Sequence, residues 1–124
     1  MNEILDFGET TRLTITVLVD NRADLIVRDT DAARYFTDEP LLAEHGYAAL
    51  VDMPGAGIRV LWDAGGTRVT LIENVRRMEV DLATIDAIAL SHGHWDHTAS
   101  VTDGSVYNSV EIWRKERTRC KLGL

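Results

Sequence analysis

A short histidine-rich segment constrains this 124-residue chain more than any other feature, because three of its four histidines lie within six residues. The segment, residues 91–98, reads Ser-His-Gly-His-Trp-Asp-His-Thr and directly follows an apolar run at residues 85–90. Neutral imidazoles and a carboxylate are suitable ligands for zinc, iron or manganese. The pattern therefore predicts a metal-binding loop at the end of a buried strand.

The spacing within this segment indicates how its donor groups could be divided between ions. His92 and His94 are two residues apart, so in an extended segment both side chains point to the same side and could hold one ion. Asp96 and His97 are adjacent and could share a second ion once the chain turns past Gly93, whose missing Cβ allows a sharp turn. The alternative is a pair of surface histidines, with Asp96 as the cap of a helix that begins at His97.

The pattern of apolar residues in the rest of the chain predicts a mixed α/β domain. Alternating and β-branched apolar runs indicate strands at residues 12–19 (with a mostly buried face), 47–53, 58–62 and 85–90. Apolar residues at helical spacing indicate a helix over residues 67–79. A Pro-Gly-Ala-Gly sequence between the second and third strands predicts an antiparallel hairpin.

Residues 22–45 show the weakest secondary-structure pattern of the chain. Residues 29–31 could cap a short helix through Phe36, and Pro40 could open another helix at residues 41–43.

The composition excludes several classes of protein. The chain holds 13 Lys and Arg against 20 Asp and Glu, and this acidic balance argues against nucleic-acid binding, which depends on clustered basic side chains. No stretch approaches the roughly 18 apolar residues of a membrane span, and the start of the chain lacks the basic patch of a signal peptide. The single cysteine, Cys120, can form no internal disulfide. We expect a cytoplasmic protein that binds neither nucleic acid nor a membrane.

The last 21 residues differ in composition from the rest. Residues 104–124 hold five basic and two acidic side chains, including both lysines of the chain. They could form an ordinary basic terminal helix or strand, or they could be unrelated to the preceding sequence. The expected division is a domain at residues 1–103 and an atypical basic tail at 104–124.

The histidine-rich segment resembles the signature of the metallo-β-lactamase superfamily, which is His-x-His-x-Asp-His at the end of a strand. Its positions are filled here by His92, His94, Asp96 and His97. Residues 61–65 are similar to the superfamily's hydrophobic-Asp-x-Gly segment, and the resemblance extends over about residues 12–103. Residues 17–21, 44–46 and 91–98 are most similar to the branch of 7,8-dihydropterin-6-methyl-4-(β-D-ribofuranosyl)aminobenzene 5'-phosphate synthase-like proteins.

The resemblance implies a role for each motif residue. His92 and His94 would ligate a first metal ion, and Asp96 and His97 a second; zinc is expected, with iron, manganese or magnesium as alternatives. A metal-bound hydroxide would then attack a small-molecule substrate, and Asp96 could also act catalytically by orienting that water. The implied activity is that of a metal-dependent hydrolase or related synthase.

Three further residues are candidates for the site. Asp63 could accept the free ring N–H of a ligating histidine and fix its tautomer, or it could be a turn-forming aspartate. Trp95 could form a wall of the substrate pocket, or it could be a core or rim aromatic residue. His45 could also face the pocket, or it could be exposed at the end of a helix.

The sequence departs from the superfamily in its second half. A complete superfamily domain is an αββα sandwich of two similar halves, and its later segments supply a further histidine, a bridging aspartate and a last histidine. No histidine follows His97. Two ligands per ion would remain, whereas a catalytic zinc ion normally has three protein ligands. We therefore expect the N-terminal half of the fold, as an incomplete fragment of impaired activity.

The missing half also suggests an alternative function. Strands at residues 47–53, 58–62 and 85–90 would expose an apolar face, through which copies of the chain could self-associate. The chain would then be a non-catalytic remnant or a weak metal-binding, self-associating module.

Overall fold

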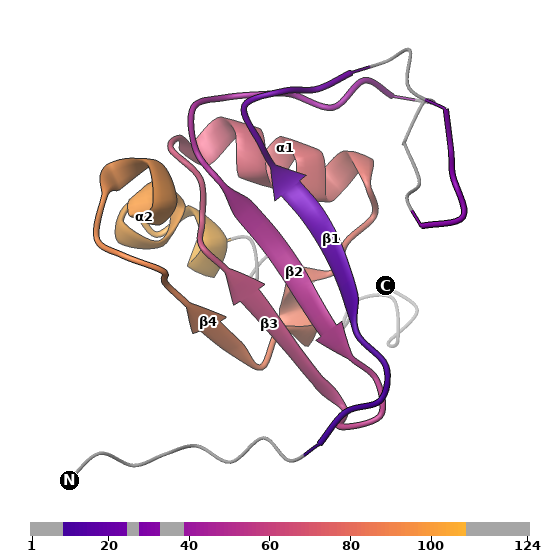
Figure 1. The fold of residues 1–124 in the computed structure, drawn as a ribbon. Helices are drawn as coiled ribbons and strands as arrows, with labels where there is room; N and C mark the ends of the chain where they lie inside the picture. The colour runs from indigo at the N-terminus through magenta and orange to yellow at the C-terminus, as the bar shows by residue number, and fades with distance from the viewer. Residues whose placement is uncertain (1–8, 25–27, 33–38, 109–124) are drawn as a thin grey trace, which may run out of the picture.

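The computed structural model describes residues 9–24, 28–32 and 39–108, which form a four-stranded sheet with helices (Figure 1). The strands lie in the order β1-β2-β3-β4, and only β3 and β4 are parallel. In chain order the elements are β1 (Thr14–Val19), β2 (Ala48–Met53), β3 (Ile58–Trp62), α1 (Arg68–Arg77), η1 (Leu82–Thr84), β4 (Ala87–Ala89) and α2 (Trp95–Thr102). The predicted mixed α/β class is confirmed.

The predicted hairpin connects β2 to β3. Five residue pairs run from Ala49 opposite Trp62 to Met53 opposite Ile58. The Ala56 amide donates to the Met53 carbonyl at 3.0 Å, and the chain reverses with Gly57 in the left-handed region at φ 66°. Glycine reaches that region without steric cost, so the turn residues determine the register of the hairpin.

The connection from β3 to β4 positions the histidine-rich segment. Because these strands are parallel, the chain crosses over through α1 and η1, and both strands end at the same edge of the sheet. Asp63 follows β3 and Ser91 follows β4 closely, so residues far apart in sequence meet at this edge.

The hydrophobic core lies between one face of the sheet and the helices. Leu71 and Val75 of α1 are fully buried with Leu18, Leu50 and Leu61 of the strands. Figure 1 shows α1 lying across the sheet, as expected for a helix with one apolar stripe. The predicted helix at residues 67–79 is confirmed, and Thr67 caps it by accepting a hydrogen bond from the Thr70 amide.

The opposite face of the sheet is apolar and exposed. Ile15 is 57% exposed and Val17 45%, and Trp62 of β3 is exposed on the same face. The expectation that residues 12–19 have a mostly buried face is therefore wrong, since only Leu18 and Val19 of β1 are buried. Period-2 alternation separates the two faces of a strand, but it does not show which face the rest of the chain covers.

We expect this exposed face to make the chain self-associate. Replacing Ile15 and Val17 together by threonine should lower the weight-average mass at high protein concentration, because apolar surface is lost from the contact while β-propensity is kept. Sedimentation velocity over a concentration series measures this effect. Val69→Thr, which changes an exposed residue of α1, is the matched control. A double variant that associates as strongly as the wild type would contradict the prediction.

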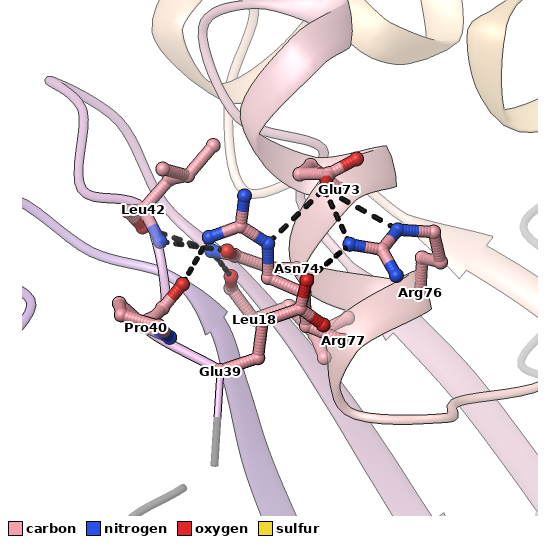
Figure 2. A network of polar contacts seen from close by, with 8 residues as sticks. All are labelled: Leu18, Glu39, Pro40, Leu42, Glu73, Asn74, Arg76 and Arg77. Carbon is pink, nitrogen blue, oxygen red and sulfur yellow. Dashed lines mark hydrogen bonds and ion pairs between the residues drawn. The ribbon is translucent and has the colours of Figure 1, made fainter. Parts of the chain in front are cut away.

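Residues 41–47 form neither a helix nor a strand, so the helix expected at residues 41–43 is wrong. Figure 2 shows the cause: the Asn74 side chain of α1 bonds both backbone groups of Leu42 and the carbonyl of Leu18. The guanidinium of Arg77 donates to the Pro40 carbonyl, and Glu73 pairs with Arg77. These bonds satisfy the backbone of the segment without a helical turn.

One further expectation is wrong, and two others fall wholly or mostly outside the described residues. Residues 85–90 are not a buried strand, because β4 spans only Ala87–Ala89 and lies at the sheet edge with Ile88 and Leu90 exposed. The helix expected through Phe36 and most of the tail at residues 104–124 fall outside the described residues. Within the described part of the chain, no helix is long and apolar enough to cross a membrane.

Candidate functional site

Three loops meet at the sheet edge where β3 and β4 end. The Asp63 amide donates to the carbonyl of Ala89 at 2.8 Å, which joins the two strand ends. The Ala64 amide donates to the His97 carbonyl at 2.7 Å, and the Tyr47 amide to the Asp96 carbonyl at 3.3 Å. Backbone hydrogen bonds thus hold the first turn of α2 against the loop after β3 and the start of β2.

Asp63 is the buried centre of this arrangement. Only 1% of the residue is exposed, and its carboxylate accepts hydrogen bonds from the Ser91 amide at 2.7 Å and the Ser91 hydroxyl at 2.8 Å. The same carboxylate lies 2.8 Å from Nδ1 of His97. Asp63 also adopts a left-handed conformation, φ 58°, at the end of β3. It therefore ends the strand and contacts a motif histidine, so the two expected roles of Asp63 are compatible.

The hydrogen bonds keep Asp63 ionised in spite of its burial. Burial acts to raise the pKa of the carboxyl, but the Ser91 amide, the His97 ring and the Ser91 hydroxyl outweigh it and lower the pKa below its ordinary value. An ionised carboxylate at this position favours the His97 tautomer with the proton on Nδ1. Nε2 then remains as the donor atom that His97 can offer to a metal ion.

The three histidines of the segment form one cluster of rings. The ring centroids of His92 and His94 are 4.6 Å apart, and those of His92 and His97 are 4.3 Å apart. Nδ1 of His92 lies 2.9 Å from the Ser91 hydroxyl. Nε2 of His92 is therefore the ring nitrogen that this histidine can offer to a metal ion. The segment thus brings His92 close to His94, as the spacing predicted, and also close to His97, which the spacing assigned to a different ion.

Asp96 lies within the first turn of α2 rather than before the helix. The helix begins at Trp95 with His94 as N-cap. The alternative in which Asp96 caps a helix beginning at His97 is therefore wrong. One carboxylate oxygen of Asp96, Oδ2, is 3.4 Å from Nε2 of His97. A carboxylate in this turn is also favoured by the helix dipole.

The turn through Gly93 does not need a glycine. Its φ is outside the left-handed region, and a Cβ at this position would meet nothing within 4 Å. The chain does bend at Gly93, but a residue with a side chain could occupy this bend.

His45 and Trp95 flank Asp96. Nε2 of His45 is 3.3 Å from Oδ2 of Asp96, and the rings of His45 and Trp95 have centroids 6.0 Å apart. Both side chains are largely exposed, so neither belongs to the core. His45 lies at a bend before β2, not at the end of a helix.

The donor groups suit a divalent ion by their chemistry. Imidazole nitrogens and a carboxylate are ligands of zinc and of other first-row metals. Within the described residues, however, no group of three or more His, Cys, Asp or Glu side chains is arranged to hold a metal ion. The residue types present fit the metal that the motif suggests, and their side chains would have to rotate to surround it.

The model of the metallo-beta-lactamase superfamily matches residues 42–105, just over half of the chain. The chain belongs to this superfamily. The match begins before β2 and ends after α2, so it includes every residue of the site described above. The family predicted from the histidine-rich segment is confirmed.

Two relatives come from Methanocaldococcus jannaschii. An uncharacterized protein is 37% identical over 73 residues, which are 59% of this chain and 25% of that protein. A 7,8-dihydropterin-6-methyl-4-(beta-D-ribofuranosyl)-aminobenzene-5'-phosphate synthase is 30% identical over 66 residues, which are 52% of this chain and 22% of the synthase. The chain spans about a quarter of the length of each relative, and the second is the synthase whose branch its sequence resembles.

Within this metallo-β-lactamase segment, sequence reasoning did not find the role of Glu44. Its carboxylate accepts hydrogen bonds from the Gly66 amide at 2.8 Å, the Thr67 amide at 3.1 Å and the Thr67 hydroxyl at 2.5 Å. The only signal was its place beside His45 in a short string typical of one branch. Bonds between residues more than 20 positions apart leave no periodic trace in the sequence.

Proposed function

We propose that this chain binds divalent metal ions, with His92 and His94 as ligands of a first ion and Asp96 and His97 as ligands of a second, as the metal-binding part of a metal-dependent hydrolase or related synthase. The observation that supports this most is the contact of the buried Asp63 carboxylate with His97. Metal-ligating histidines commonly donate their second ring N–H to a carboxylate, which fixes the ring and increases its basicity.

Each side chain has a separate part in this proposal. His97 and His92 would each bind through Nε2, since Nδ1 is directed to Asp63 in one ring and to the Ser91 hydroxyl in the other. His94 and Asp96 would complete the donor set, and Asp96 could also hold a proton or orient water. Zinc is expected, with iron, manganese or magnesium as alternatives; a bound ion lowers the pKa of coordinated water.

The substrate we propose is a small molecule. Similarity to a synthase whose name contains a dihydropterin and a ribofuranosyl phosphate supports this class for the whole protein. The formal charge of −7 is unfavourable for nucleic-acid binding. We propose a cytoplasmic location for the same protein.

A second candidate function is a weak metal-binding module that pairs with another copy of the chain. Two observations favour it: the exposed apolar face of the sheet and the absence, within the described residues, of donors already arranged for a metal. The four motif residues give two ligands to each of two ions, fewer than the three of an ordinary catalytic zinc site. Weak binding is expected for either function.

Zinc titration calorimetry at neutral pH tests the metal site. We expect fewer than two equivalents of zinc to bind, and His94→Ala should reduce the affinity at least tenfold because it removes one of few ligands. Thr102→Ala, at the far end of α2, is the control and should bind as the wild type does. Equal zinc affinity in the wild type and His94→Ala would contradict the assignment. Two tightly bound ions that support hydrolysis would instead refute the expectation of weak binding.

A further inference from the structure

A residue outside the histidine-rich segment contacts one of its proposed ligands. We propose that His45 is a positioning residue that holds the Asp96 carboxylate for the metal ion, and that Glu44 fixes His45 there from the N-terminus of α1. This inference rests on the proposed function, in which Asp96 is a metal ligand.

The contact between His45 and Asp96 carries the first step. Nε2 of His45 lies 3.3 Å from Oδ2 of Asp96, the same oxygen that lies 3.4 Å from Nε2 of His97. His45 is 72% exposed in its side chain, whereas Asp96 is only 15% exposed. An imidazole held at ion-pair distance from a carboxylate oxygen limits the rotation of that carboxylate, in the way that outer contacts orient metal ligands.

Glu44 carries the second step, because it fixes the chain next to His45. Its carboxylate accepts from the amides of Gly66 and Thr67, which lie at the start of α1, where unpaired N–H groups attract negative charge. Its own amide donates to the carbonyl of Asp20 at 3.1 Å, just after β1. Glu44 is therefore held between the end of β1 and the beginning of α1.

The backbone on the other side of His45 is also fixed. The Gly46 amide donates to Oδ1 of Asn21 at 3.1 Å, and a Cβ on Gly46 would lie 2.5 Å from the Asp96 carbonyl oxygen. A Cβ on Gly66 would lie 2.7 Å from the His45 carbonyl oxygen. The backbone that carries the His45 ring is thus held on both sides, and only rotation about the side-chain bonds can move the ring relative to Asp96.

Cobalt(II) binding by the full chain, followed by its visible spectrum, tests the proposal without any substrate. We expect His45→Ala to weaken cobalt affinity about tenfold or more while the melting temperature stays unchanged, because the side chain is exposed. His45→Gln, which keeps an N–H donor, should restore part of the affinity. Tyr107→Ala removes another exposed ring and should leave binding unchanged. Equal affinity in His45→Ala and the wild type would overturn the proposal.

A second pair of variants tests Glu44. Glu44→Ala should reproduce the loss of cobalt affinity expected for His45→Ala. The cobalt titration is run well below the melting temperature of the variant, and the spectrum at saturating cobalt is the reference for full occupancy. Glu73→Ala is the matched control, since it removes another carboxylate that bonds at α1 but pairs with Arg76 and Arg77. A normal affinity in Glu44→Ala would refute the part assigned to Glu44.

A measurement on the metal-free chain separates this inference from the proposed function. If His45 contacts Asp96, its imidazole NMR resonances should shift in Asp96→Asn and in Glu44→Ala but not in Glu73→Ala. Unshifted His45 resonances in Asp96→Asn would overturn the inference. Absence of cobalt binding by the wild type would overturn the proposed function, and the resonances would still report on the contact.

Discussion

Asp63→Asn is expected to lower the free energy of unfolding by about 3 kcal/mol and zinc affinity by about 10- to 100-fold. The buried carboxylate accepts from the Ser91 amide, the Ser91 hydroxyl and His97, and an asparagine side chain has one oxygen to offer to these donors. The NH₂ group of the asparagine would face the His97 ring. The His97 tautomer with the proton on Nδ1, which presents Nε2 to a metal ion, would then lose its hydrogen-bond acceptor. Urea unfolding measures the first effect and calorimetric zinc titration the second.

Asp86→Asn is the matched control for this prediction. Asp86 is an exposed carboxylate that accepts a backbone hydrogen bond from Arg59 at 2.8 Å, away from the histidines. It should change stability by less than about 1 kcal/mol and leave zinc affinity unchanged. If Asp63→Asn behaved like Asp86→Asn in zinc binding, Asp63 would have only a structural role at the end of β3.

Gly46→Ala is expected to destabilise the chain by about 3 kcal/mol through overpacking and backbone strain. The residue has φ 151°, and a Cβ would lie 2.5 Å from the Asp96 carbonyl oxygen and 3.0 Å from the Gly66 nitrogen. Both are backbone atoms, so a side-chain rotation cannot relieve the contacts. The first turn of α2 would have to move, and zinc affinity should fall with stability.

Gly55→Ala is the control for the glycine prediction. It lies in the hairpin turn, and its nearest neighbour to an added Cβ is the Thr10 hydroxyl oxygen at 3.8 Å, an ordinary contact. Chemical denaturation should give a change within about 0.5 kcal/mol. Equal stabilities of the two alanine variants would show that the loops around Gly46 adapt more easily than the geometry indicates.

Much of the fold follows from local patterns that the sequence displays. Paired apolar runs joined by turn residues predicted the β2–β3 hairpin, and apolar residues at helical spacing predicted α1. The helix expected at residues 41–43 failed because Asn74, a residue of another element, bonds the backbone of Leu42. Local capping signals carry no information about such a distant partner, and the same holds for Glu44 at the start of α1.

The candidate site divides in the same way. Four donors within six residues indicated the chemistry, because that clustering needs no tertiary structure to bring His92, His94, Asp96 and His97 near one another. Asp63 was a candidate with two open readings, and its contact with His97 depends on the parallel pairing of β3 and β4. The contact of His45 with Asp96 depends on the close packing of the loops before β2, after β3 and at the start of α2, which Gly46 and Gly66 allow.

The sequence by itself therefore determined the superfamily, the order of most elements and the set of candidate ligands. These are properties of residue type and short spacing, which the chain carries in any conformation. Only the tertiary structure decided which sheet face is covered, which carboxylate holds His97 and which residue lies beside Asp96. Those outcomes depend on hydrogen bonds and close backbone contacts between residues 20 or more positions apart, which form only when the strands and loops are assembled.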